Sequence, residues 1–294
     1  MHISRVSRVS PKSRRPSRTV KAARWGAALL ALSGTASVLA PLSAQAGGPA
    51  GDPGREKPTI VLVHGAFADA SSWNGVVQRL QQNGYTVAAP ANPLRGIPED
   101  SAYLASFLKS VSGPIVLVGH SYGGEVITQA AVGNDNVKAL VYIDAIMPDA
   151  GESFTSLSAK FAPAPLTKAL KQVPFRNGDG TTGTDVYVQP ALLRQVFAAD
   201  LPTSQTTLLA ATQRPIALSA FSAKLTGAAW RDRPVYVLVG KQDRAINPDL
   251  ERFEAKRAHA RKTVEIDSSH VSLVSHPQAV KDLIVDAAEN YMWH

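Results

Sequence analysis

Residues 116–124 read Val-Leu-Val-Gly-His-Ser-Tyr-Gly-Gly, and this stretch decides the fold. Three apolar residues lead into Gly-His-Ser-Tyr-Gly at residues 119–123, and a helix-compatible segment, residues 125–131, follows directly. A strand, a tight turn that carries a serine, and a helix are typical of a nucleophile elbow. The flanking residues must be small because such a turn holds the serine in an unusual backbone conformation. Ser121 is therefore predicted to project beyond a strand end as a nucleophile.

Apolar runs alternate with helical patterns on both sides of this stretch. Each run ends at a glycine, a proline or a polar residue, as buried strands do. Strands separated by helices indicate a parallel sheet covered on both faces. The predicted fold class is therefore α/β, a three-layer α/β/α fold with a mostly parallel six-stranded sheet and catalytic groups beyond the carboxyl ends of its strands. The predicted strands are residues 59–63, 85–89, 114–118, 137–143, 234–240 and 262–266.

The alternation breaks between about residues 148 and 226. This segment is rich in proline, has short helical patterns at residues 191–198 and 206–211, and has a glycine-rich turn at residues 177–180. We expect an inserted cap rather than further sheet. Its apolar side chains are expected to wall a pocket for the apolar part of a substrate. They are Phe154, Leu157, Phe161, Leu166, Val173, Phe175, Leu192, Leu193, Val196 and Phe197.

The positive charge of the chain lies at its beginning. The formal net charge is +8, and residues 1–46 hold eight Lys and Arg residues and no acidic residue, so the remaining chain has no net charge. A basic domain would indicate nucleic acid or an anionic membrane as partner. Because the basicity is confined to the leader, we expect no nucleic-acid partner.

The leader has the three parts of a secretory signal. A basic region ends at Arg24, an apolar stretch follows from Trp25 to about Leu42, and Ala-Gln-Ala at residues 44–46 is a cleavage site. We predict a signal peptide at residues 1–46, a flexible mature N-terminus at residues 47–57, and one domain at residues 58–294. The protein is then secreted or periplasmic, without stable membrane insertion after cleavage.

The export route and the cysteine content add two expectations. The pair Arg14-Arg15 resembles a twin-arginine signal, but Pro16-Ser17 stands where such signals have an apolar residue, which favours the Sec route. The chain has no cysteine, which excludes disulfides, thiolate catalysis and zinc–sulfur sites. The oligomeric state stays open.

A serine nucleophile needs a base, most often histidine. His270 follows the last predicted strand in the loop Asp267-Ser268-Ser269-His270, so it can reach over the sheet edge. The other histidines are less suited. His64 ends the first strand, and His120 lies inside the elbow, next to Ser121. His259 lies in a charged helix, His276 starts the last helix, and His294 is the last residue.

The base needs an acid that orients it. Asp243 follows the strand at residues 234–240 and lies between Ser121 and His270 in the chain. Asp144 is the competitor because it also ends a predicted strand, and Asp243 is favoured for its place in the order Ser, Asp, His.

An acyl-transfer site also needs donors for the oxyanion of its tetrahedral intermediate. The amide of Tyr122, at the start of the elbow helix, is one predicted donor. The loop after the first strand supplies the other, because Gly65 lets the backbone turn close to the nucleophile, and we assign the amide of Ala66.

These motifs together resemble an α/β-hydrolase-fold serine hydrolase. The chain is most similar to the compact group of plant methylesterases, hydroxynitrile lyases and their bacterial esterase relatives, from about residue 59 to the C-terminus. The resemblance implies Ser121 as nucleophile, Asp243 as acid, His270 as base, and the amides of Ala66 and Tyr122 as oxyanion hole. It is carried by residues 64–67, 72–73, 119–124, 243–246 and 269–270.

The resemblance implies hydrolysis of a carboxylic ester with an apolar acyl or alcohol part. His270 takes the proton of Ser121, an acyl-enzyme forms, and water releases it, with no metal and no organic cofactor. One alternative is a lyase or a cofactor-free perhydrolase on the same triad. Plant hydroxynitrile lyases carry a lysine beside the catalytic histidine, whereas Val271 stands here. Another alternative is a binding protein of the same fold with little turnover.

Overall fold

The computed structural model describes residues 56–291. Within this part of the chain, six parallel strands form one sheet in the order β2-β1-β3-β4-β8-β9. All six are the strands predicted from the apolar runs. They are β1 (Thr59–Val63), β2 (Val87–Ala88), β3 (Ile115–His120), β4 (Val137–Ile143), β8 (Val235–Gly240) and β9 (Lys262–Ile266). The predicted signal peptide and nearly all of the predicted flexible segment lie outside the described residues.

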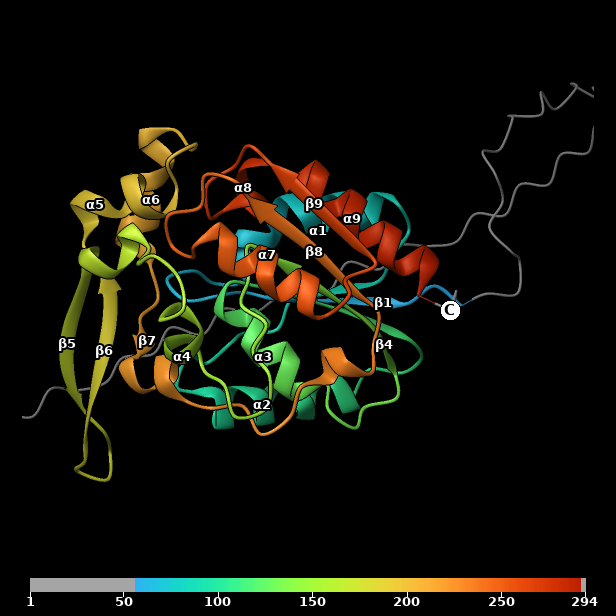
Figure 1. Ribbon diagram of the computed structural model, residues 1–294, viewed down its shortest axis with the longest axis horizontal. Helices are drawn as coiled ribbons and strands as arrows, with labels where there is room; N and C mark the ends of the chain where they lie inside the picture. Colours follow the sequence, from blue (N-terminus) through green and yellow to red (C-terminus); the bar gives the residue numbers. More distant parts are fainter. Residues whose placement is uncertain (1–55, 292–294) are drawn as a thin grey trace, which may run out of the picture. The chain divides into compact units, whose positions relative to one another are not determined.

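Helices cover both faces of the sheet (Figure 1). On one face α1 packs against α9, and on the other α2 packs against α3, while α7 packs on β8. Strands β3 and β8 are buried along their whole length because helices cover them on both sides. The helices are α1 (Asn74–Gln82), α2 (Ile97–Lys109), α3 (Tyr122–Ala130), α7 (Pro248–Arg257), α8 (Ser272–Ser275) and α9 (Pro277–Asn290).

The segment between β4 and β8 forms a layer beyond the carboxyl ends of the sheet strands (Figure 1). We call it the cap. It begins with α4 (Phe154–Ser158) and continues into the strands β5 (Leu170–Arg176) and β6 (Thr182–Val188). It then has α5 (Pro190–Phe197), α6 (Thr203–Thr212) and β7 (Ile216–Ala217), and 3-10 turns complete it.

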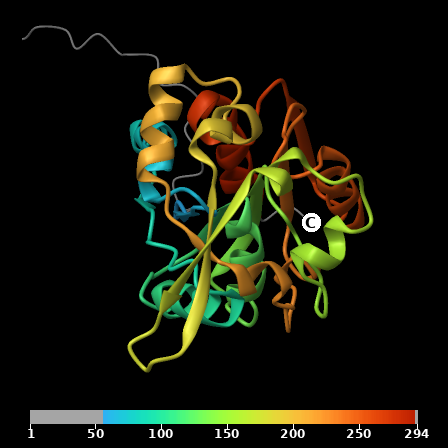
Figure 2. The same ribbon diagram turned by 90° about the vertical axis from the view of Figure 1, so that its left-hand side faces the viewer.

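The expectation that this segment contains no further sheet is wrong. Strands β5, β6 and β7 form an antiparallel sheet, and the β5–β6 hairpin projects from the cap (Figure 2). The glycine-rich turn at residues 177–180 is the tip of this hairpin. Its strands escaped the sequence analysis because β5 reads Leu-Lys-Gln-Val-Pro-Phe-Arg, in which Pro174 is typical of a loop or an edge strand.

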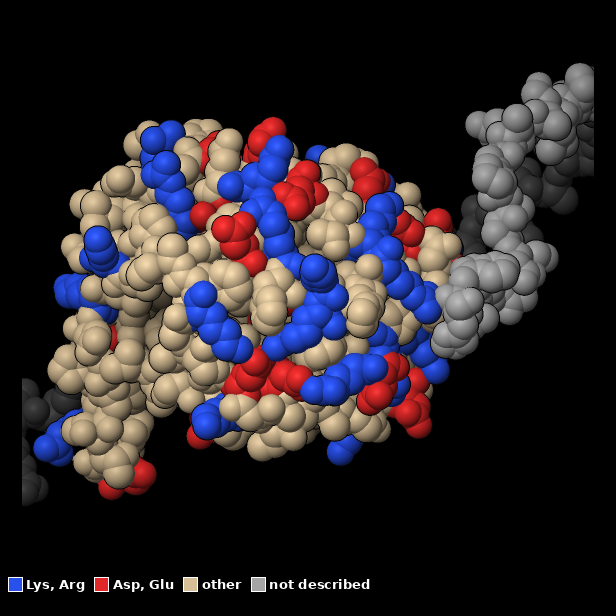
Figure 3. Space-filling view, in the orientation of Figure 1, with Lys and Arg blue, Asp and Glu red and all other residues tan. Residues whose placement is uncertain are grey.

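Charges of both signs are interspersed on the face of the molecule shown in Figure 3. The end formed by β5 and β6 is mostly uncharged in that view. Within residues 56–291, no helix combines the length and the hydropathy that crossing a membrane requires.

Glycines next to the Ser121 turn let helix α3 pack directly on the sheet. A methyl group at Gly119 would lie 2.6 Å from the carbonyl oxygen of Gly123, and one at Gly123 would lie 2.5 Å from that of Val63. Both neighbours are backbone atoms, so a side chain at either position would push α3 away from β1 and β3.

We predict that Gly123→Ala destabilises the domain by about 1–3 kcal/mol or more, because overpacking forces the backbone apart. Gly178→Ala is the matched control, since a methyl group there meets no atom within 4 Å. Urea denaturation followed by circular dichroism measures both. Equal unfolding free energies for the two variants would contradict the packing argument.

Candidate active site

Ser121 forms the turn between β3 and α3. Its backbone has φ 53° and ψ −125°, a conformation that residues other than glycine rarely adopt. Its amide donates to the carbonyl of Ile143 at 3.3 Å, which ties the turn to β4. A methyl group at Gly65 would lie 2.6 Å from Cβ of Ser121, so the loop after β1 passes directly beside the serine.

His270 and Asp243 form a buried pair on neighbouring loops. Nδ1 of His270 lies 2.6 Å from Oδ2 of Asp243. The Asp243 carboxylate accepts, so Nδ1 carries the proton and Nε2 is free to act as a base. Nε2 has no hydrogen-bond partner among the described residues, and His270 and Ser121 line the same cavity. The structure thus brings the predicted nucleophile, base and acid to one place.

Backbone amides hold the Asp243 carboxylate in position. Its Oδ1 accepts from the amide of Ala245 at 2.6 Å and from that of Ile246 at 3.0 Å, so the side chain presents Oδ2 to His270. These bonds close the turn between β8 and α7 around the carboxylate.

Asp144, the competing acid, has different partners. Its Oδ1 accepts from the amide of Gly240 at 2.9 Å, and its Oδ2 accepts from the amide of Ser272 at 3.1 Å and from the Ser272 hydroxyl. It ties together the ends of β4 and β8 and the loop between β9 and α8, residues 267–271, which carries His270 and which we call the histidine loop. The hydrogen-bonded acid of His270 is Asp243.

The pKa of His270 reflects two opposed effects. Burial alone would lower it, but the charge of Asp243 and its hydrogen bond outweigh burial and raise the pKa of His270 above 6.5. A base must be neutral to accept a proton, so reaction requires a pH above that raised pKa.

The predicted oxyanion donors lie beside the serine. Tyr122 is the first residue of α3, so its amide has no acceptor within the helix. No hydrogen bond is formed by the amide of Ala66 within residues 56–291. His64 supports this loop: its Nδ1 donates to the carbonyl of Gly65 at 2.9 Å, and its Nε2 accepts from the amide of Asn92 at 3.0 Å.

The cavity above Ser121 has a volume of about 70 Å³ and an apolar wall. Of the cap residues expected to wall it, Phe154, Leu166 and Phe197 do so, together with Phe221, which the sequence analysis did not single out. Leu157, Leu193 and Val196 are instead buried in hydrophobic clusters.

Most of the sequence matches one known protein family. The sequence model of the alpha/beta hydrolase family matches residues 60–283. The chain is an alpha/beta hydrolase. The predicted fold class is confirmed.

Individual relatives of this hydrolase belong to the group that its motifs resemble. Methylesterase 2 of Arabidopsis thaliana is 25% identical over 262 residues, which cover 81% of this chain and 98% of that protein. The alpha-hydroxynitrile lyase of Arabidopsis thaliana is 26% identical over 258 residues, covering 79% and 98%. The crystal structure of polyneuridine aldehyde esterase has a TM-score of 0.69 and 20% identity, and covers 79% of this chain and 100% of that chain. The predicted group is thereby confirmed.

The remaining histidines of the hydrolase are not candidates for the base. His259 is exposed just beyond the end of α7, His276 lies at the start of α9, and His294 lies outside the described residues. His120 is buried, and its Nε2 donates to the carbonyl of His270 at 2.9 Å. It therefore holds the backbone of the histidine loop at His270.

One residue that holds the histidine loop in place was not predicted from the sequence. Asp200, between α5 and α6 of the cap, accepts from the amide of Ser269 at 3.1 Å and from the hydroxyls of Ser268 and Ser269. Phe197, three residues earlier, lies with its ring centroid 4.9 Å from that of His270. Asp200 lies in a turn two residues before Pro202, and nothing in the sequence predicted its partner 69 residues away.

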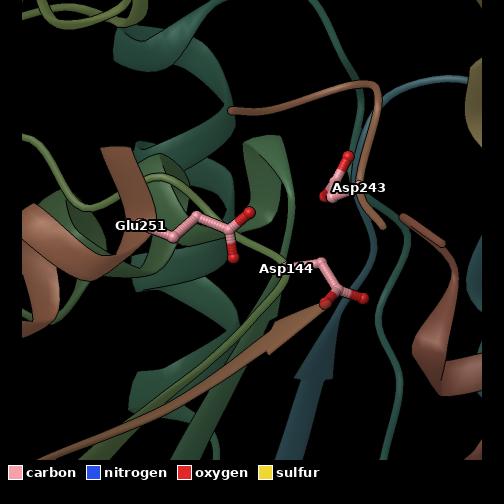
Figure 4. Close-up of side chains that lie close together, drawn as sticks. All are labelled: Asp144, Asp243 and Glu251. Atoms are coloured by element: carbon pink, nitrogen blue, oxygen red, sulfur yellow. The ribbon is translucent and has the colours of Figure 1, made fainter. Parts of the chain in front are cut away.

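Asp243 also belongs to a cluster of three buried acids. Asp144, Asp243 and Glu251 each offer a carboxylate oxygen within 4.8 Å of the others, and all three are buried (Figure 4). Within residues 56–291 it is the one group of three such side chains whose oxygens lie close enough together to share a metal ion.

We predict that Asp243→Asn lowers kcat by about 10³–10⁴-fold, because an amide favours the wrong tautomer of His270. The acid limb of the pH profile of kcat/KM moves to lower pH, because the charge that raises the His270 pKa is gone. Asp267→Asn is the control, since Asp267 lies in the loop that carries His270 but is exposed and pairs with Lys241. A variant Asp243→Asn with wild-type kcat would reject Asp243 as the acid.

Proposed function

We propose that this protein hydrolyses carboxylic esters through an acyl-enzyme on Ser121. One observation carries the proposal: His270, oriented by Asp243, has an Nε2 without a partner among the described residues and lines the same cavity as Ser121. Relatives of the chain include proteins named methylesterase and esterase, which agrees with this chemistry.

In the reaction, Nε2 of His270 takes the proton of the Ser121 hydroxyl as its oxygen attacks the ester carbonyl carbon. The amides of Ala66 and Tyr122 stabilise the negative charge on the carbonyl oxygen, and each such donor contributes about 3–4 kcal/mol. His270 then gives the proton to the leaving alcohol. Water attacks the acyl-enzyme in the same way and releases the acid. Asp243 stabilises the imidazolium at both stages.

The cavity favours a short acyl group. Its volume of about 70 Å³ is roughly half of an engineered apolar cavity of ~150 Å³ that holds benzene. Its wall consists largely of the aromatic and aliphatic side chains of Phe154, Phe197, Phe221 and Ile246. Among the described residues no lysine lines it, which favours hydrolysis over the lyase alternative.

We predict that the mature protein cleaves p-nitrophenyl acetate and butyrate faster than the octanoate, because the long acyl chain exceeds the cavity. Ser121→Ala lowers kcat/KM by at least about 10³-fold, since the nucleophile is lost. Ser219→Ala, which removes an exposed hydroxyl of the cap, leaves it unchanged within about twofold. Nitrophenol release followed by absorbance measures all three.

Wild-type turnover by Ser121→Ala would contradict the proposal. Cleavage of a cyanohydrin without any release of nitrophenol would replace it with the lyase alternative.

We also propose that residues 1–46 are a cleaved export signal and that the mature protein is secreted or periplasmic. The basic start, the apolar stretch and Ala-Gln-Ala at residues 44–46 support this. Expression of the full chain in a bacterium should yield an exported protein that begins at Gly47, as read by N-terminal sequencing. A full-length protein retained in the cytoplasm would contradict it.

A further inference from the structure

The cluster of Asp144, Asp243 and Glu251 contains one carboxyl group, that of Glu251, that has no role in the site described above. Asp144 follows β4, Asp243 follows β8, and Glu251 lies on α7 with its side chain directed toward the two aspartates (Figure 4). Glu251 is 1% exposed, so water does not solvate its charge.

The hydrogen bonds of the cluster are unequal. The oxygens of Asp144 and Asp243 accept from the backbone amides, the serine hydroxyl and the histidine already described. Neither oxygen of Glu251 receives a hydrogen bond from any residue in the described part of the chain. A carboxyl group that faces other carboxylates and receives no donor can form a hydrogen bond only by donating its own proton.

The charges around Glu251 also favour a bound proton. Asp144 faces it from the end of β4, Asp243 from the β8–α7 loop, and Glu254 from α7 itself, while the imidazole of His270 lies behind Asp243. No lysine or arginine of the described residues forms an ion pair with Glu251. Burial, followed by the charges of Asp243 and Asp144, raises the pKa of Glu251 well above its usual range.

We propose that Glu251 is a positioning residue of the active site whose protonated carboxyl group donates a hydrogen bond to the Asp243 carboxylate. This bond fixes the acid that orients His270 and moderates its negative charge. The proposal rests on the triad of the proposed function. It extends the chain of hydrogen bonds that begins at His270 and Asp243 by one residue, Glu251.

A proton fits this cluster better than a cation. Calcium takes about six to eight oxygen ligands and magnesium about six in near-octahedral geometry. The cluster offers three side chains, and two of them already accept hydrogen bonds with both oxygens. Only Glu251 has free oxygens, and one free carboxyl group does not replace the hydration shell of a divalent ion.

The pair of variants Glu251→Gln and Glu251→Leu tests the proposal. The amide of Gln donates from nearly the same position as the protonated carboxyl group, so this conservative variant keeps kcat/KM within about threefold and leaves the acid limb of its pH profile in place. Leu fills the space without a donor, so Asp243 becomes more basic toward His270. We expect the acid limb to move upward by about 0.5–1 pH unit, with a lower kcat.

Other results would overturn the proposal. If Glu251 were ionised, both variants would remove a negative charge and move the acid limb to lower pH. If Glu251 only filled space, Leu would leave the limb in place. If the cluster held a metal, EDTA would abolish wild-type activity and calcium or magnesium would restore it. Asp249→Asn, an exposed acid on the same helix, is the control and changes none of these readouts.

Two readouts are independent of ester turnover. The infrared spectrum of the wild type at pH 7 should contain the carbonyl band of a buried carboxylic acid that Glu251→Gln lacks. The NMR titration of His270 should reproduce the shift of the acid limb in Glu251→Leu. Both measurements can be made even if the enzyme cleaves no tested ester. If Glu251→Leu does not fold, the infrared comparison of the wild type with Glu251→Gln still tests the proposal. An unchanged infrared band would contradict the protonated state.

Discussion

The structure depends on the backbone of Ser121, which is held at positive φ in a turn that leaves no room for side chains beside it. The turn costs conformational energy, on the order of 1–3 kcal/mol for such a residue, and it persists because the surrounding structure fixes it. β3 enters the turn from the centre of a sheet, and α3 leaves it packed against the carbonyl of Val63. The same geometry places the first amide of α3 and the loop at Gly65 beside the serine, so the strain and the candidate oxyanion hole have one origin.

Three aspartates from separate segments hold the loop that carries His270. Asp243 bonds to the imidazole, Asp144 bonds to Ser272 two residues later, and Asp200 of the cap bonds to Ser269 one residue earlier. The cap therefore contributes to the position of the base as well as to the wall of the cavity. Burial and the charges of Asp243 and Asp144 raise the pKa of Glu251 well above its usual range, in line with the proton assigned to it.

Local sequence patterns predicted the sheet and the candidate triad for a physical reason. Each central strand is a short apolar run that ends where a polar or glycine-rich loop begins. Because Ser121, Asp243 and His270 each follow a strand of a parallel sheet, they lie at the same sheet edge. Asp200 and Glu251 could not be predicted in this way. Asp200 acts through serines 68 and 69 residues away, and Glu251 belongs to a residue type that is usually solvated. The β5–β6 hairpin was missed because Pro174 within β5 is typical of a loop or an edge strand.

The proposed mechanism requires a covalent acyl group on Ser121 during turnover. Protein mixed with p-nitrophenyl butyrate, quenched in acid within the first turnovers and digested, can be read by peptide mass spectrometry. We predict a butyryl group on the peptide that contains Ser121, formed together with the first equivalent of nitrophenol. Turnover with no acyl group on that peptide, or with the group on a different residue, would contradict the central claim.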